Sequence, residues 1–521
     1  MKKSFLESIY LYPILFPANL VLTLAGANLV NLTYYEIAQS IVVLCVLVGL
    51  VFGLLYLIKR DWQRSSFLMF VGAIWAAYFG VVVSLLKSHT RLPMDINQQI
   101  LFLVIWSSIF GFMGSPWLWR HVRRPGTITA YLNVLMVGLV LLSLYRIQSY
   151  QSGNVDMAQY RNTFPVIDDL QASTQPPDIY YIILDGYGQA DTLAKIYAWD
   201  NSTFLDYLTK KGFYIASESR TNYVQTGLSL ASSLNFDYLP SFPENSRDGR
   251  PLVNFIQHSR LLKILENLGY STYTFQTPYQ TTNITQADHF YGGAQSVRTQ
   301  ALIGLLMMNS IASLAIELEL IRPPLPSYGE QQNLVLNNLD ELANVAERPG
   351  PKFVFLHLLI PHPPFIFTQD GPITPKAVYT LTDADLFQGT AQQYIAGYTS
   401  QVAYLNQALE KSLNIVLSRS SSPPIIILQG DHGPGAFFGQ TISKTCLQER
   451  FGILNAYLLP GIDSARLYPS ISPVNTFRLV LDAYFEASLN LLPDQHYYSN
   501  FIQPYSFINV GEEMNQPCNI P

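Results

Sequence analysis

The first 150 residues alternate between long apolar runs and short charged clusters. Five runs carry no Asp, Glu, Lys or Arg and are 21 residues or longer: Ser8–Tyr35, Ile37–Ile58, Ser65–Leu86, Ile96–Trp119 and Pro125–Tyr145. About 20 apolar residues in a helix span the hydrocarbon core of a bilayer. The pattern therefore predicts a five-helix transmembrane domain over residues 1–150, with helices at about 8–30, 37–58, 65–86, 98–119 and 126–145. Buried helices of a water-soluble core are the rejected alternative.

Lys and Arg in the short loops predict the orientation of these helices. The N-terminal side carries eight of them: Lys2, Lys3, Lys59, Arg60, Arg64, Arg120, Arg123 and Arg124. The opposite side carries four: Lys87, Arg91, Arg146 and Arg161. We therefore expect a cytoplasmic N-terminus and an extracytoplasmic chain after residue 150. The first run also resembles a signal peptide with a cleavage site at Ala25-Gly26-Ala27, and cleavage would leave four spans with the same sidedness.

From residue 177 onward, short apolar strands alternate with helical patterns, after a polar stretch over 151–176 that we interpret as a linker. Strands are expected at Asp178–Leu184, Phe213–Ser217, Ser271–Gln276, Lys352–Leu358, Pro424–Leu428 and Ile453–Leu459. Helices are expected at Leu252–Leu268, Gln331–Ala346, Ala391–Leu417 and Val474–Leu489. Continuous apolar strands are typical of a sheet covered on both faces. The pattern predicts a three-layer α/β domain with a mainly parallel sheet over residues 177–521.

Composition excludes several classes of protein. Apolar residues make up 49 % of the chain, which excludes general disorder, and a net charge of −5 gives no basic surplus for nucleic acid. Three Cys exclude a disulfide scaffold and a Cys-rich zinc module. Cys45 lies inside the second span and is expected to be buried. Cys446 and Cys518 both fall on the oxidising side, so we predict that they pair, with two unrelated thiols as the alternative.

Polar side chains follow three of the expected strands. Asp185-Gly186 follows the first strand, His357 and His362 lie at the end of the fourth, and Asp431-His432-Gly433 follows the fifth. Ligands bind beyond the carboxyl ends of the strands in such sheets. Two Asp and one His suit a divalent cation, which needs at least one further oxygen.

Thr226 is a candidate for that oxygen. It stands where a loop becomes a helix that carries Leu228, Leu230 and Leu234. A hydroxyl there meets free backbone N–H groups and the positive end of the helix, which suits an alkoxide or a transferred anion. The simpler alternative is that Thr226 or a neighbouring residue only caps the helix.

In this order the motifs resemble the alkaline phosphatase/sulfatase superfamily. The matching pieces are Asp178-Ile-Tyr-Tyr-Ile-Ile-Leu-Asp-Gly186, Thr226-x-x-Ser229, His357-x4-His362-Pro and Asp431-His432-Gly433. Spans followed by an external catalytic domain resemble lipoteichoic acid synthases and lipid A phosphoethanolamine transferases. The resemblance implies a multi-pass enzyme of the cell (inner) membrane with a periplasmic catalytic domain.

The resemblance also implies roles for single residues. Thr226 corresponds to the nucleophile, and Asp185, Thr226, Asp431 and His432 correspond to the ligands of one divalent metal ion. His362 corresponds to a substrate-contacting catalytic histidine, and His357 to an additional substrate-binding histidine. Three oxygens and one imidazole favour Mn or Zn, with Mg or Ca as alternatives.

The function implied is transfer of a phosphodiester headgroup, of the phosphoglycerol or phosphoethanolamine type, from a phospholipid to an envelope glycan or lipid through a covalent Thr226 intermediate. The alternatives are a hydrolase of phosphate or sulfate esters and, in a different class, a non-enzymatic membrane protein. The formylglycine signature of true sulfatases, Cys or Ser followed by x-Pro-Ser-Arg, is absent. These transferases often have another histidine beyond Asp-His-Gly, but the 60 residues that follow the motif here contain none, which leaves Lys444 or Arg450 as substitutes.

A further apolar run, Thr299–Ile316, lies within the second half and borders on the length of a sixth span. A single crossing there would separate Asp185 and Thr226 from Asp431 and His432 by the membrane. We therefore expect the run to stay on the outer side. Two alternatives remain: a helix buried in the core of the catalytic domain, or a helix at the membrane surface near a lipid substrate.

Overall fold

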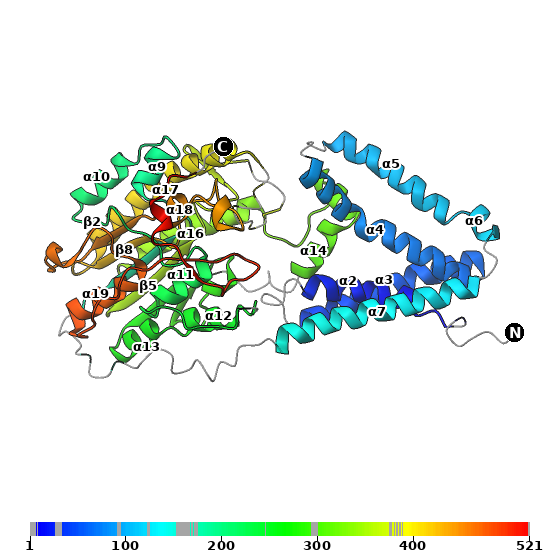
Figure 1. Cartoon of the computed structure of the whole chain (residues 1–521), viewed down its shortest axis with the longest axis horizontal. Helices are drawn as coiled ribbons and strands as arrows, with labels where there is room; N and C mark the ends of the chain where they lie inside the picture. The colour runs from blue at the N-terminus through cyan, green and yellow to red at the C-terminus, as the bar shows by residue number, and fades with distance from the viewer. Residues whose placement is uncertain are drawn as a thin grey trace. The chain divides into compact units, whose positions relative to one another are not determined.

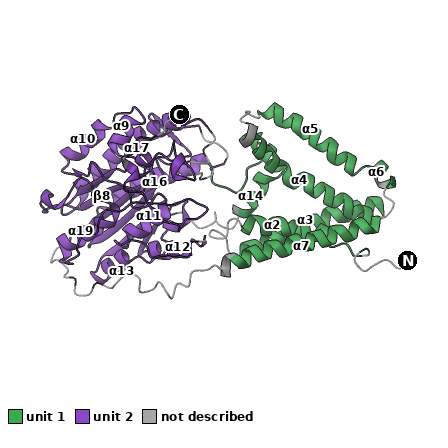
Figure 2. Cartoon of the chain, viewed as in Figure 1, with its two compact units in different colours: residues 1–153, 295–327 green, residues 154–294, 328–521 purple. Residues whose placement is uncertain are grey.

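A computed structural model describes residues 9–26, 34–90, 95–121, 125–152, 176–244, 246–292, 301–374 and 389–518, with a few isolated positions between them. The chain forms two compact units (Figures 1 and 2): residues 1–153 with 295–327, and residues 154–294 with 328–521. We call them the membrane unit and the catalytic unit. The predicted catalytic domain, continuous over 177–521, thus differs from the structure in residues 295–327. Most of the predicted linker 151–176 lies outside the described residues.

The membrane unit contains the predicted apolar helices. They are α2 (Tyr12–Gly26), α3 (Tyr34–Lys59), α4 (Trp62–Thr90), α5 (Ile96–Met113), α6 (Pro116–His121) and α7 (Pro125–Ser152). Four of them, α3, α4, α5 and α7, are long and apolar enough to cross a membrane. The first expected span is a shorter helix of 15 residues with Pro17 inside it. The fourth ends early because Gly114 caps α5 and Pro116, which cannot donate a helical hydrogen bond, begins α6.

Two sequence expectations in this unit need correction. Cys45 is not buried but half-exposed on α3, although its Sγ lies 3.9 Å from the carbonyl oxygen of Ile14 on α2. The apolar run 299–316 forms α14 (Ala301–Asn309) and α15 (Ala312–Glu317), which pack on helices of the membrane unit. Burial in the core of the catalytic domain is therefore wrong.

The catalytic unit is built on a seven-stranded sheet. Its strands, in spatial order, are β2 (Tyr214–Ile215), β9 (Asn455–Leu458), β8 (Ile425–Gly430), β1 (Ile179–Leu184), β5 (Lys352–Leu358), β3 (Ser271–Phe275) and β4 (His289–Tyr291). The five from β8 to β4 run parallel, and β9 is antiparallel to both of its neighbours. All six predicted strands are present, and the mainly parallel sheet is confirmed.

Helices cover both faces of the sheet, which explains why β1 is apolar throughout. Tyr180, Ile182 and Leu184 belong to one core with α10 (Ser202–Lys210), α16 (Tyr328–Val345) and α17 (Ala391–Arg419). Ile179, Tyr181 and Ile183 belong to the other core with α11 (Thr226–Ser233), α12 (Arg250–Gln257), α13 (Arg260–Asn267) and α19 (Pro473–Phe485). The helix predicted over 252–268 is two helices, because Ser259 caps a new start.

Short elements complete the catalytic unit. They are α9 (Ala190–Lys195), α18 (Leu447–Phe451), the hairpin of β6 (Phe367–Thr368) and β7 (Gly371–Pro372), and the pair β10 (Tyr497–Tyr498) and β11 (Ile508–Asn509). Cys446 precedes α18 and forms a disulfide with Cys518, with 4.9 Å between the two Cα atoms. The predicted pairing of Cys446 with Cys518 is thus present, and it attaches the C-terminal segment to α18.

Loss of this disulfide is expected to destabilise the catalytic unit. The bond joins positions 72 residues apart, and closing such a loop in the unfolded chain is worth about 2–4 kcal/mol. We expect Cys518→Ser in the detergent-solubilised full chain to unfold at a lower temperature than the wild type. Reductant should bring the wild type to the same temperature, and Cys45→Ser should leave the transition unchanged. Equal transitions for Cys518→Ser and oxidised wild type would contradict the prediction.

Candidate metal centre and active site

Parallel pairing brings the predicted acidic residues to one edge of the sheet. Leu184 of β1 lies in register with Leu358 of β5 and with Gly430 of β8, so the residues that follow emerge side by side. The chain turns at Gly186, whose φ of +74° favours glycine. Its N–H donates a hydrogen bond of 2.9 Å to Asp431 Oδ1, which joins the two acidic strand ends.

Thr226 is the first residue of α11, and its hydroxyl does not cap the helix. The capping position belongs to Gln225, whose side chain makes no capping hydrogen bond. Thr226 Oγ1 instead lies 3.2 Å from His432 Nε2. The capping alternative from the sequence is therefore wrong, and the hydroxyl points toward the histidine at the end of β8.

His432 Nε2 is the point where the predicted ligands meet. Asp185 Oδ1 and Asp431 Oδ2 each lie 3.5 Å from it, beside the Thr226 hydroxyl. The other ring nitrogen, Nδ1, lies 2.9 Å from the carbonyl oxygen of Gly433, which fixes it as the donor. In this tautomer Nε2 presents a lone pair toward the carboxylates, as metal-ligating histidines do. The four residues predicted to surround one ion are therefore brought together.

His357 lies among these groups rather than at a substrate surface. Its Nε2 is 3.3 Å from Asp185 Oδ2, its Nδ1 is 2.8 Å from Thr282 Oγ1, and its side chain is 0 % exposed. Asp185, His357 and Asp431 can each offer one ligand atom, and these three atoms lie within 4.8 Å of one another. The predicted substrate contact for His357 does not fit this burial, whereas a ligand or ligand-orienting role does.

The charges of the site fit a bound cation. Among the described residues, Asp185 Oδ1 and Asp431 Oδ2 are buried without a hydrogen-bond partner. Two buried carboxylates with open oxygens are costly unless a positive charge compensates them. Burial raises the pKa of Asp185, but the nearby His362, a hydrogen bond with His357, and His432 together lower that pKa below its usual range. Carboxylate and imidazole ligands of this kind suit a divalent metal ion.

His362 follows the fourth predicted strand on a loop that returns to the site. Its backbone N–H donates to the carbonyl oxygen of Asp185 at 3.0 Å, and its ring centroid is 6.1 Å from that of His432. Its Nδ1 lies 2.7 Å from the carbonyl oxygen of Pro363, so in the neutral ring Nδ1 carries the proton. The structure thus places the predicted catalytic histidine beside the candidate ligands.

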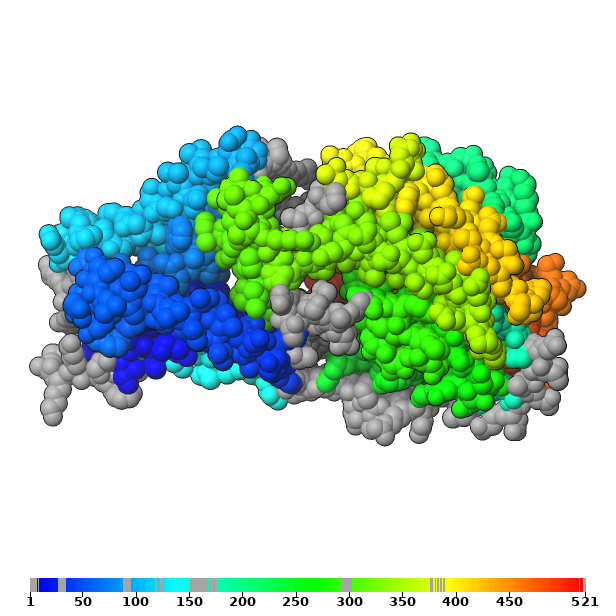
Figure 3. Space-filling model, turned by 180° about the vertical axis from the view of Figure 1, so that it is seen from behind, coloured from blue at the N-terminus to red at the C-terminus, as the bar shows by residue number. Residues whose placement is uncertain are grey.

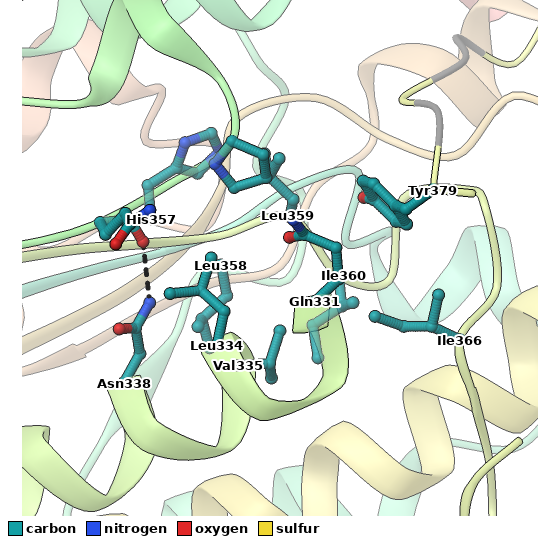
Figure 4. Close-up of a pocket in the computed structure, with 12 residues that line it drawn as sticks. Gln331, Leu334, Val335, Asn338, His357, Leu358, Leu359, Ile360, Ile366 and Tyr379 are labelled. Carbon is teal, nitrogen blue, oxygen red and sulfur yellow. Dashed lines mark hydrogen bonds between the residues drawn. The ribbon is translucent and has the colours of Figure 1, made fainter. Parts of the chain in front are cut away.

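A narrow cavity adjoins His357 on the side of α16 (Figure 4). Leu358, Leu359 and Ile360 line it from the end of β5, and Leu334 and Val335 line it from α16. Asn338 donates a hydrogen bond of 3.0 Å to the carbonyl oxygen of Gln276 at its rim. Among Asp185, Thr226, His357, Asp431 and His432, Thr226 is the residue that is partly exposed.

Arg450 braces the loops that carry Thr226 and His432. Its Nε donates to the carbonyl oxygen of Val224 at 3.0 Å, and its Nη1 donates to that of Gly433 at 3.4 Å. The guanidinium lies 4.4 Å from the centre of the Phe438 ring, and the residue is 1 % exposed. Lys444, the other substitute suggested by the sequence, is exposed.

Thr221 is a supporting residue that sequence reasoning missed. Its hydroxyl donates to the carbonyl oxygen of Asp431 at 2.6 Å and lies 3.1 Å from Ser229 Oγ. It thereby links the loop before α11 to the end of β8. A single Thr in a polar stretch carries no spacing signal, so the sequence could not have identified it.

Glu449, next to Arg450, is expected to make stability depend on pH. Burial raises the pKa of Glu449 to about 7, although Tyr197 donates a hydrogen bond of 2.6 Å to its carboxylate. A raised folded-state pKa favours folding while the group is protonated, and this contribution is lost as pH rises through about 7. Between pH 5 and 8, the unfolding free energy should fall by roughly 3 kcal/mol at most through this group.

Glu449→Gln should remove this contribution, because glutamine does not ionise. Thermal unfolding of the full chain across this pH range should show the variant becoming more stable than the wild type as pH rises. A constant difference between the two proteins would contradict the assignment.

Comparison with known proteins assigns more than half of the chain to one family model. The sulfatase family model matches residues 177–453, from just before β1 to just after the Asp-His-Gly motif. No curated protein matches the chain significantly.

Several solved structures are similar at low identity. The C-terminal periplasmic domain of EptC from Escherichia coli, in complex with Zn, has 13 % identity and a TM-score of 0.43, covering 68 % of this chain and 100 % of that one. The integral membrane lipooligosaccharide phosphoethanolamine transferase A (EptA) from Neisseria meningitidis has 14 % identity and a TM-score of 0.39, covering 92 % and 95 %. A 2-O GAG sulfatase has 15 % identity and a TM-score of 0.36, covering 61 % and 72 %.

Proposed function

The chain belongs to the sulfatase family, and from that premise we propose that it is a membrane-bound, metal-dependent transferase of a phosphodiester headgroup. The headgroup is of the phosphoglycerol or phosphoethanolamine type, the donor is a phospholipid, and the acceptor is a hydroxyl of an envelope glycan or lipid. One observation carries the proposal. A partly exposed hydroxyl, Thr226 Oγ1, lies 3.2 Å from His432 Nε2, which itself lies 3.5 Å from oxygens of Asp185 and Asp431.

Asp185, Thr226, Asp431 and His432 would hold the metal ion, with His357 as a further candidate ligand. A bound divalent cation supplies positive charge that favours the alkoxide of Thr226 and polarises a non-bridging phosphate oxygen. The donor set of oxygens and imidazoles suits Mn or Zn, with Mg or Ca as alternatives. Tethering to membrane helices favours a donor that is itself a lipid.

The reaction proceeds through two displacements at phosphorus. In the first, Thr226 reacts as the alkoxide, and its Oγ forms a bond to phosphorus while the bond from phosphorus to the diacylglycerol oxygen breaks. The protonated ring of His362 gives its proton to that departing oxygen. The result is a phosphodiester of Thr226, whose negative charge lies at the N-terminus of α11.

The second displacement regenerates the enzyme. The acceptor hydroxyl attacks phosphorus, its proton passes to His362, and the bond from phosphorus to Thr226 Oγ breaks, which returns Thr226 to the alkoxide. A water molecule in place of the acceptor would make the protein a hydrolase on the same site. The absence of Cys or Ser followed by x-Pro-Ser-Arg argues against the formylglycine chemistry of ordinary sulfatases.

Mass spectrometry of the intermediate tests the proposal. Trypsin releases residues 221–247, which include Thr226, as one peptide. After incubation of the purified, metal-loaded full chain with phosphatidylglycerol or phosphatidylethanolamine, this peptide should gain the mass of phosphoglycerol or phosphoethanolamine. The peptide from Thr226→Ala should gain neither. An unmodified peptide together with hydrolysis of a soluble sulfate or phosphate ester would refute the transferase and favour the hydrolase.

A further inference from the structure

Residues 301–317 belong to the membrane unit, although the chain on both sides of residues 295–327 belongs to the catalytic unit. Figure 3 shows this segment, in light green, against the blue helices of the membrane unit. Its first helix, α14, packs on α2, α3 and α4, and its second, α15, packs on α4. The segment is therefore part of a bundle that we expect to lie in lipid.

The junction of α14 and α15 contacts α4 near the middle of that helix. The backbone N–H of Ile311 donates a hydrogen bond of 2.7 Å to the carbonyl oxygen of Ala76. One turn further along α4, a Cβ on Gly80 would collide with the carbonyl oxygen of Met308 and lie 2.9 Å from that of Asn309. The absence of a side chain at Gly80 thus allows the segment to seat against α4.

Helix geometry gives the depth of this contact. Ala76 precedes Lys87, the charged residue near the outer end of α4, by 11 positions. At about 1.5 Å per residue, the contact lies roughly 16 Å below Lys87. A hydrocarbon core is about 30 Å thick, so the junction lies about half-way through it.

Both ends of the segment return to the outer side. Leu302, 1 % exposed, packs with Ala25 at the end of α2, Ile37 at the start of α3 and Ile147 near the end of α7. At the other end, Glu317 Oε2 lies 3.3 Å from Lys87 Nζ, and Gln99 Nε2 donates to Glu317 Oε1 at 2.7 Å. The predicted orientation places all of these helix ends outside the cytoplasm.

The turn of the segment satisfies its own polar groups, as non-helical backbone inside a membrane requires. Asn309 Nδ2 donates to the carbonyl oxygen of Leu305 at 2.8 Å, and Ser310 Oγ donates to that of Met307 at 2.9 Å. The backbone N–H of Ala312 donates to Ser310 Oγ at 3.2 Å. Together with the bond from Ile311 to Ala76, these contacts suit a turn that lies away from water.

From these contacts we propose that residues 301–317 form a re-entrant hairpin that enters the bilayer from the outer side and reaches about its middle. The hairpin contacts the groove of α2, α3 and α4 and the acyl chains around that groove. The chain passes between the two units at residues 153–154, 294–295 and 327–328. The hairpin thus adds two connections to the one that follows α7. Restricting that unit to the membrane surface favours a lipid-embedded donor, a consequence that rests on the proposed function.

Depth measurements by spin labelling test the hairpin without any assay of activity. In the full chain carrying Cys45→Ala, with the disulfide intact, single labels are placed at Ser310→Cys and at Leu320→Cys, which is 72 % exposed in the wild type. In nanodiscs, the label at 310 should collide more often with oxygen, and the label at 320 more often with a water-soluble nickel chelate. Equal access of the nickel chelate to both labels would overturn the proposal.

Two glycines of α4 provide a matched pair of variants. Gly80→Ala forces a Cβ into the backbone of α14, whereas Gly72→Ala meets nothing within 4 Å, and both changes favour a helix equally. Gly80→Ala should open the label at 310 to the nickel chelate, and Gly72→Ala should not. A shielded label in both variants would show that the hairpin is not seated on Gly80 and would refute the proposed groove.

Turnover then tests the consequence. Gly80→Ala should lower kcat/KM at least tenfold for a phospholipid in the bilayer and leave a soluble phosphodiester unaffected, while Gly72→Ala changes neither. Equal losses on both substrates would refute the tethering role. Absence of turnover in the wild type would refute only the proposed function, because the depth measurements do not depend on it.

Discussion

Replacing Thr226 by Ala is expected to lower turnover by about 10⁴-fold or more, as loss of a covalent nucleophile does in other enzymes. The fold should remain intact, because the hydroxyl is partly exposed and its one described hydrogen bond is to His432. The measurement is the rate of headgroup transfer from a labelled phospholipid, together with the thermal unfolding temperature of the same preparation. Unfolding should occur within a few degrees of the wild type.

Two further variants make this prediction specific. Thr226→Ser keeps a hydroxyl and should retain measurable transfer and the covalent adduct. Thr209→Ala removes a hydroxyl from the exposed face of α10, where it bonds only within its own helix, and should be neutral. Turnover by Thr226→Ala within tenfold of the wild type would exclude a covalent Thr226 intermediate.

Asp431→Asn is expected to remove both the bound metal and the activity. Asp431 Oδ1 accepts a hydrogen bond from the Gly186 N–H, whereas Oδ2, buried beside His432, has no hydrogen-bond partner among the described residues and is open to a cation. We expect a metal content near zero by elemental analysis and a loss of turnover of about 10³-fold or more. Asp191→Asn is the matched control, because this carboxylate is 67 % exposed and pairs only with Lys195 on the surface.

Chelation provides the independent test of the same site. A chelator should abolish turnover, and Mn or Zn should restore it in the wild type but not in Asp431→Asn. Metal at about 1,000 times its Kd would stabilise the wild type by about 4 kcal/mol, so chelation should lower its unfolding temperature. The metal-free variant should be no less stable than metal-free wild type, because the substitution removes one of two neighbouring buried charges. A chelator-resistant wild type would contradict the metal centre.

Much of the fold could be predicted because burial leaves a plain pattern. β1 is apolar at every position since each face of the sheet meets a helical layer, and the four long membrane helices are apolar because lipid surrounds them. β4 could not be predicted, because its three residues, His289–Tyr291, are too few to show an alternation of apolar and polar positions. The break between α12 and α13 was also missed, because the apolar spacing continues across it and Ser259 alone marks the new start.

The candidate site was predictable where Asp or His directly follows an expected strand. Asp185 and the Asp431-His432 pair satisfy this rule, and Thr226 was found from the change of pattern at the start of α11. The location of His357 could not be foreseen, since its burial depends on Thr282 and Asp185, which contact it only in the fold. Arg450 was suggested as a substitute for a missing histidine. Its bracing of two loops depends on carbonyl oxygens, which every residue has.

The placement of α14 and α15 also determines how the catalytic unit would behave when isolated. A protein beginning at residue 177 would retain residues 301–317 but lose the helices on which they pack. Leu302 and Leu314, buried against α2, α3, α4, α5 and α7 in the full chain, would then face water. Such a fragment would associate through this segment or need detergent, although every strand of its sheet is present. Replacing the segment with a short polar loop, rather than moving the starting residue, is the change that would make the fragment soluble.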